Sequence, residues 1–266
     1  ELFGEKERSH PVSPLETWLR IPRLHHLLPY EGYCPETRLF FNRHTTGFVL
    51  QGNPLVGASL KDQGQMADFF RQENNLPEGS SLQFLLWASP RIRPFFDYWR
   101  HAKEGDVFRK LAERRISFLE EKAFSDPLGH LVRDFKVIIS YTVPGLKHEL
   151  ADIENLLEIR RSLQGALQMI GMPTESVDAP TFIRSVSEIL NVDHTTLPDD
   201  LGWNEYESIS NQILSSDRSW QVESDRTILK SGEWIAQSWV PAKSPREWGL
   251  PNMDRFLGHV LDSHQS

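Results

Sequence analysis

The stretch Arg38-Leu39-Phe40-Phe41-Asn42-Arg43-His44-Thr45-Thr46-Gly47-Phe48-Val49-Leu50-Gln51-Gly52 predicts a β-hairpin. Two runs rich in aromatic and β-branched residues flank a short polar segment, as expected for two strands joined by a tight connection. We therefore expect the body of the protein to contain a sheet against which the rest of the chain packs.

Helices and single strands alternate along the chain after this hairpin. We expect helices at residues 59–74, 91–123 with a break near Gly105, 149–170, 181–190 and 252–261, and strands at residues 82–87, 135–143, 174–177, 219–229 and 232–241. The run 82–87 is almost continuously apolar, which predicts a strand buried on both faces. This order favours an α+β fold with a mixed or antiparallel sheet and helices mainly on one face.

Composition changes along the chain suggest three segments. Residues 1–23 are polar and contain prolines, so we expect an amino-terminal arm that docks through Trp18 and Leu19. Residues 24–171 form a first α+β lobe, and residues 172–266 form a second, acidic α+β lobe if the body divides near Gly171. An acidic loop is expected at residues 191–206.

The overall composition is that of an ordinary globular protein. Hydrophobic residues make up 39% of the 266 residues and charged residues 25%, with a formal net charge of −8. The longest apolar runs fall far short of the roughly 20 residues that a membrane-spanning helix needs. Residues 1–10 are charged and do not resemble a signal peptide, so we expect a cytoplasmic protein. A single cysteine, Cys34, excludes an internal disulfide.

The short motifs of common enzymes are absent from this sequence. No glycine is followed by lysine, so the phosphate-binding loop of the Walker type cannot form. The patterns G-x-G-x-x-G, G-x-S-x-G and H-E-x-x-H are also missing. Adjacent His25 and His26 point in different directions on a regular element and make a weak metal site. We therefore expect no catalytic residues, metal or cofactor in this chain.

Charge is distributed unevenly. Between Arg91 and Arg115 eight Lys and Arg residues face four acidic ones, whereas residues 172–240 carry twelve acidic and four basic residues. We expect the aromatic residues of the basic segment, Phe95, Phe96, Tyr98 and Trp99, to pack inward. The basic residues then form either a solvated surface or a docking face for an acidic partner or anionic lipid. The candidate docking face consists of Arg91, Arg93, Arg100, Arg109, Lys110, Arg114 and Arg115. Net negative charge makes a nucleic-acid partner less favourable.

Several packing and turn residues resemble a known family. They include Leu28, Pro29 and Tyr30, the hairpin residues Thr46 and Gly47, the strand Phe135-Lys136-Val137-Ile138-Ile139-Ser140-Tyr141, and Val177-Asp178-Ala179-Pro180-Thr181-Phe182-Ile183. In this order and spacing, across about residues 24–260, they resemble the amino-terminal, non-catalytic region of the TraC family, the ATPases of F-type conjugative type IV secretion systems.

This resemblance implies a docking and assembly region at the bacterial inner membrane, in contact with inner-membrane secretion subunits and with other copies of the ATPase. ATP hydrolysis would then belong to a separate carboxy-terminal domain. Two alternatives remain open, a free-standing enzyme whose site uses scattered residues and a nucleic-acid contact module built on the basic helices. A deep pocket with convergent titratable groups would favour an enzyme, and a broad exposed apolar patch would favour docking.

Overall fold

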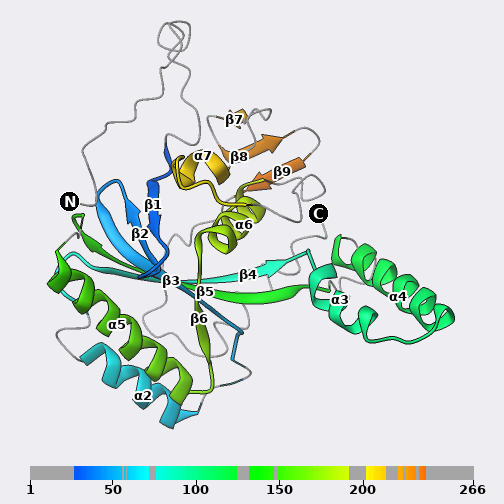
Figure 1. The fold of residues 1–266 in the computed structure, drawn as a ribbon, viewed down its shortest axis with the longest axis horizontal. Coiled ribbons are helices and arrows are strands. Elements are labelled where there is room, and N and C mark those ends of the chain that lie inside the picture. The colour runs from blue at the N-terminus through cyan, green and yellow to red at the C-terminus, as the bar shows by residue number, and fades with distance from the viewer. Residues whose placement is uncertain are drawn as a thin grey trace, which may run out of the picture.

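The computed structural model describes residues 27–55, 57, 59–71, 76–124, 132–146, 149–191, 202–213, 221–223, 226–231 and 234–237. The expected arm at 1–23, the expected helix at 252–261 and most of the acidic loop lie outside this part of the chain. The described residues form an α+β fold, as the sequence predicts (Figure 1).

An antiparallel sheet is the centre of the fold. Its strands follow the order β1 (Tyr30–Cys34), β2 (Leu39–Asn42), β3 (Thr45–Gly52), β5 (Asp134–Pro144) and β4 (Ser81–Ser89), and β6 (Thr174–Ser176) also pairs with β3. The expected hairpin is confirmed as β2 and β3, with Phe40 opposite Gly47. The sequence did not predict β1, because Leu28, Pro29 and Tyr30 were expected only as packing and turn residues. Gly32 and a register shift make β1 short and irregular.

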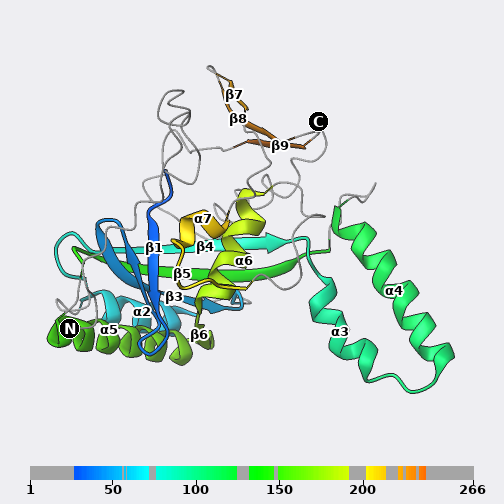
Figure 2. The ribbon, with the colours of Figure 1, turned by 45° about the horizontal axis from the view of Figure 1, so that its top comes forward.

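Helices cover both faces of this sheet rather than mainly one (Figure 2). The helices α2 (Leu60–Arg71) and α5 (Leu150–Met169) pack on one face, and α6 (Ala179–Leu190) and α7 (Ile209–Ile213) pack on the other. Apolar side chains alternate along the strands, so Leu39, Phe48 and Leu50 enter the first core while Phe40 and Val49 enter the second. We expected helices mainly on one face of the sheet, and this was wrong because the side chains on both faces of these strands are apolar.

Residues 172–191 and 202–213, which follow Gly171, pack against the same sheet as the residues before it. Strand β6 forms backbone pairs with β3, where Leu50 lies opposite Ser176. Phe182 and Ile209 share a core with residues of the first hairpin. Up to residue 213, the described part of the expected second lobe therefore shares a sheet and a core with the first. Three short strands, β7 (Gln221–Glu223), β8 (Arg226–Ser231) and β9 (Trp234–Gln237), form a second antiparallel sheet in place of the two longer strands we expected.

Strand β4 differs from its prediction in burial. It forms where we expected it, but its central residues Phe84, Leu85 and Leu86 are 49%, 43% and 42% exposed. The prediction of burial on both faces was wrong because β4 lies at the end of the sheet order and pairs with β5 alone among the described strands. An apolar run reports a preference for burial, and the position of the strand decides whether neighbours provide it.

A helical hairpin connects β4 to β5. It consists of α3 (Arg93–His101) and α4 (Asp106–Phe124), with the break near Gly105 that the sequence predicts, where φ is +85°. The hairpin extends away from the sheet and the other helices (Figures 1 and 2). In the described part of the chain, no helix combines the length and apolar character that crossing a membrane requires.

Candidate docking surface

One buried carboxylate of α6 contacts the chain where the helical hairpin begins. Glu188 on α6 accepts a hydrogen bond from the Ser89 hydroxyl at 3.0 Å and lies within 3.4 Å of the indole nitrogen of Trp87. Arg91, whose side chain is only 14% exposed, places its Nε 3.8 Å from the same carboxylate. These contacts join the end of β4 to α6, so the start of the hairpin is held firmly against the body.

Ion pairs hold the two helices of the hairpin together. Arg93 on α3 pairs with Glu113 and with Glu120 on α4, the latter at 2.8 Å. Arg100, nearer the end of α3, lies 3.3 Å from Glu113. The hydrogen bond from Arg93 lowers the pKa of Glu113, so this carboxylate stays charged. Together with buried Ala112 and Ile116, these pairs fix α4 along α3.

Large apolar side chains remain exposed on this hairpin. Six of them are exposed to solvent, namely Phe95, Trp99, Val107, Phe108, Leu111 and Phe118. Phe95 is 73% exposed and Trp99 is 36% exposed. The expectation that the aromatic residues of this segment pack inward was therefore wrong for these two. The sequence held a signal that we missed, because α4 carries apolar residues on more than one side and α3 can cover only one of them.

The predicted basic residues do not form one free cationic face. Arg91, Arg93 and Arg100 are engaged by carboxylates, and Arg109 lies 2.7 Å from Asp106. Lys110, Arg114 and Arg115 are exposed on α4 and make no ion pair with any residue that the structure describes. The remaining basic surface is therefore concentrated on α4, next to the exposed Leu111 and Phe118. We call the exposed side chains of residues 107–118 the α4 surface.

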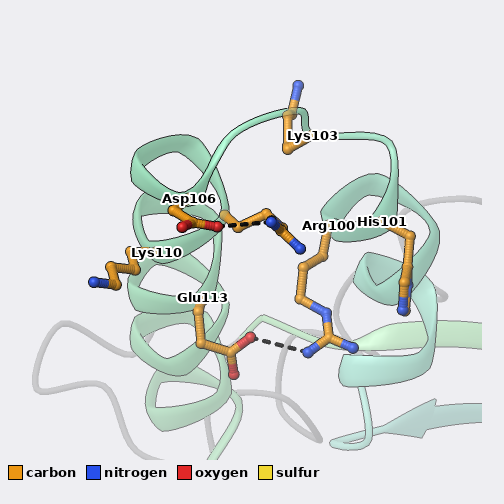
Figure 3. A pocket seen from close by; sticks show the side chains of 7 residues that line it. Arg100, His101, Lys103, Asp106, Lys110 and Glu113 are labelled. Carbon is orange, nitrogen blue, oxygen red and sulfur yellow. Dashed lines mark hydrogen bonds and ion pairs between the residues drawn. The ribbon is translucent and has the colours of Figure 1, made fainter.

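A cavity of about 460 Å³ lies at the tip of the hairpin, between the end of α3 and the start of α4 (Figure 3). It is lined by Arg100, His101, Lys103, Asp106, Arg109, Lys110 and Glu113. Figure 3 shows Lys103 and Lys110 pointing away from its centre, while Arg100 reaches toward Glu113. Four Lys and Arg side chains against two carboxylates make the tip cationic, which suits an anionic group at its surface.

Leu28, Pro29 and Tyr30, which carry part of the family resemblance, make contacts within the folded body. Tyr30 packs edge-on against Phe182 of α6 with ring centroids 4.9 Å apart, and burial raises the pKa of its hydroxyl. Leu28 packs against the same core, and its carbonyl and that of Tyr30 accept hydrogen bonds from Ser210. The carbonyl of Pro29 accepts a bond from the amide of Arg43.

Thr46 and Gly47 lie where β3 meets β5. The Thr46 hydroxyl is buried and donates to the Gly145 carbonyl at 3.0 Å. A Cβ atom at Gly47 would collide with the backbone oxygen of Tyr141, so no larger residue fits there without a shift of the strand. Both residues are explained by packing, and neither lies on the α4 surface.

A second cavity, of about 530 Å³, lies between α6 and the sheet. Its walls are mostly apolar and include Phe40, Val49, Leu85 and Phe182. Among the described residues, no three His, Cys, Asp or Glu side chains gather as metal ligands would.

Comparison with known proteins gives two matches. The family described as TraC protein matches residues 24–266. Protein TraC of Escherichia coli (strain K12) is 30% identical over 227 residues, which cover 79% of this chain and 25% of that protein. The chain thus spans about a quarter of the length of this relative. Since the family match covers more than half of the sequence, the chain belongs to the TraC family.

Proposed function

We propose that this region is the docking and assembly part of a conjugative type IV secretion ATPase, which acts in pilus assembly and conjugal DNA transfer. Membership of the TraC family supports this proposal. The sequence has no Gly-Lys pair with which to build a phosphate-binding loop, so ATP binding and hydrolysis are assigned to another part of the parent protein. The region itself uses no cofactor.

One observation carries the docking role. The α3–α4 hairpin extends from the body, and its large apolar side chains are exposed at positions such as Phe108, Leu111 and Phe118. Exposed apolar groups that cluster on one projecting element are typical of interaction sites, because leaving them in water is unfavourable. The hydrogen bond between Glu188 and Ser89 at the start of the hairpin supports the same role, since a docking element must hold its position relative to the rest of the machine.

The α4 surface also favours a particular partner. Lys110, Arg114 and Arg115 lie beside Leu111 and Phe118, so the complementary segment carries apolar side chains flanked by acidic ones. We assign this segment to an inner-membrane subunit of the secretion system, which places the region peripherally at the cytoplasmic side of the inner membrane. Other copies of the ATPase are further partners, and anionic lipid adds a weaker contact.

Photo-crosslinking tests this assignment directly. A benzophenone amino acid placed at Leu111 in the complete secretion ATPase is expected to capture an inner-membrane subunit, whereas the same group at Leu150, an exposed residue of α5, is not. Leu111→Asp combined with Phe118→Asp should lower conjugation while leaving the melting temperature within about 3 °C, because both side chains are exposed. Wild-type transfer by this double variant, with no captured subunit, would refute the proposal.

A further inference from the structure

Strand β4 ends the sheet in the described part of the chain. Its nine residues pair with β5 in one uninterrupted register, from Ser81 opposite Thr142 to Ser89 opposite Asp134. Among the described strands, none pairs with its other side. That side therefore presents backbone N–H and C=O groups in the spacing that a further strand needs.

The usual protections of an edge strand are absent from β4. Natural edges are commonly blocked by charged side chains, by proline or by a bulge. The segment 81–89 contains no charged residue and no proline, and its register with β5 has no irregularity. Exposure is greatest in the middle, at Phe84, Leu85 and Leu86, which are the residues that a bound strand would cover.

We propose that a second copy of this chain adds its own β4 to this edge, antiparallel, about a twofold axis at Leu85. The segment is close to self-complementary about that residue. The pairing places Phe84 opposite Leu86 of the second copy, Gln83 opposite Trp87, and Ser81 opposite Ser89. Each of these pairs shares one face of the joined sheet, because residues an even number of positions apart point the same way.

The two faces of the joined sheet receive matching side chains. Phe84 and Leu86 lie on the face of Ile139 and Val137, which belongs to the core beneath α5. Leu85 lies opposite Ile138, on the face that α6 covers. Apolar pairs would therefore extend both cores across the junction, and no like charges would meet in it.

The expected dimer is concentration-dependent. One pair of nine-residue strands buries less area than the standard interface of about 1,200–2,000 Å². A dimer held by this contact alone should therefore dissociate readily. Copies held close together in an assembly would pair more completely, because the effective concentration rises. This inference deepens the self-association included in the proposed function and is independent of the α4 surface.

Charge substitution at the axis tests the pairing. Sedimentation equilibrium of the 266-residue chain should show a reversible dimer. Leu85→Lys places two lysines opposite each other and should weaken the dimer at least about tenfold, as should Leu85→Glu. An equimolar mixture of these two variants should dimerise again, because lysine then faces glutamate. Leu150→Lys, at an exposed position of α5, is the matched control and should dimerise like the wild type.

Disulfide formation tests the register even if a charged variant folds poorly. In a Cys34→Ser background, Leu85→Cys should form an intermolecular disulfide under mild oxidation, since residues opposite each other in antiparallel strands have Cα atoms about 4.5–5.5 Å apart. Ser81→Cys should not, because it faces Ser89. A wild-type chain that stays monomeric at all concentrations, or equal crosslinking at both positions, overturns the inference. Capture of a membrane subunit from Leu111 would then still support the proposed function.

Discussion

The carboxylate of Glu188 on α6 accepts a hydrogen bond from the hydroxyl of Ser89 at the end of β4, although the two residues lie 99 positions apart. This contact connects the helix that covers one face of the sheet to the point where the projecting hairpin begins. The position of the candidate docking surface thus depends on a residue in a different part of the sequence.

Replacing Glu188 by alanine should lower the free energy of unfolding by about 2–4 kcal/mol. The buried hydroxyl of Ser89 would lose its acceptor, and Arg91, whose side chain is only 14% exposed, would lose a nearby negative charge. Urea denaturation measures the effect. Glu158→Ala, on the exposed side of α5, is the control and should change stability by less than about 0.5 kcal/mol. Equal stabilities of the two variants would show that the Glu188 cluster contributes little.

Tyr30→Ala should destabilise the protein by about 2–4 kcal/mol, as large-to-small changes in a core do. The ring packs against Phe182, so its loss opens space between β1 and α6. Leu27→Ala, three residues earlier at an exposed position, should have almost no effect. If thermal unfolding of the Tyr30 variant matches that of the wild type, Tyr30 is a surface residue available for docking.

Asp178 should give α6 a stability that depends on pH. Burial alone would raise the pKa of its carboxyl, but hydrogen bonds from the amide and hydroxyl of Thr181 outweigh this and lower it below 3.8. A lowered pKa means that the stabilisation is complete above 3.8 and disappears as pH falls through the folded-state value. Asp178→Ala should therefore cost about 1 kcal/mol at neutral pH and progressively less in acid.

Asp178→Asn is the matched variant for this test. Asparagine also caps helices but does not titrate in this range, so most of the neutral-pH stability should remain. Chemical denaturation between pH 2.5 and pH 7 separates the two outcomes. A constant difference between the wild type and Asp178→Ala over this range would contradict the assignment.

Reversing charge on α4 should reduce attachment to the membrane. Glutamate at Arg109, Lys110, Arg114 and Arg115 is expected to lower recovery with vesicles that contain anionic lipid, and to lower conjugation, without unfolding the protein. Each basic residue near such a surface contributes about 1 kcal/mol, and the attraction decays over roughly 8–10 Å at physiological salt. The loss should therefore resemble the effect of high salt on the wild type.

Lys61→Glu combined with Arg161→Glu, on α2 and α5, provides the control for this experiment. It changes net charge at exposed positions away from the α3–α4 hairpin and should leave vesicle binding less affected. If the fourfold α4 variant sediments with vesicles and supports conjugation like the wild type, the basic residues of α4 are ordinary solvated surface.

The 266-residue chain should not bind ATP with micromolar affinity. The backbone amides of a glycine-rich loop and a following lysine normally hold the phosphates, and the chain has no Gly-Lys pair. Calorimetric titration with magnesium and ATP measures this. A saturable micromolar isotherm would contradict the prediction and would favour the alternative of an enzyme with scattered site residues.

Local patterns in the sequence determined most of the secondary structure. The hairpin of β2 and β3, the helix α5 and the break near Gly105 were all predictable, because turn residues and apolar periodicity act within a few residues of each other. The short strand β1 was not, since it contains Gly32 and obtains its pairing from β2. The boundaries of β7, β8 and β9 were also wrong, because short strands carry little periodic signal.

Only the tertiary structure decided what each apolar or charged face meets. The sequence marks the 82–87 run as apolar, but the sheet order left Phe84 exposed at an edge. The excess of basic residues at 91–115 was visible, yet the pairing of Arg93 with Glu120 needed two helices to come together. Periodicity specifies which side of an element avoids water, whereas burial and ion pairing depend on neighbours that are distant in the chain.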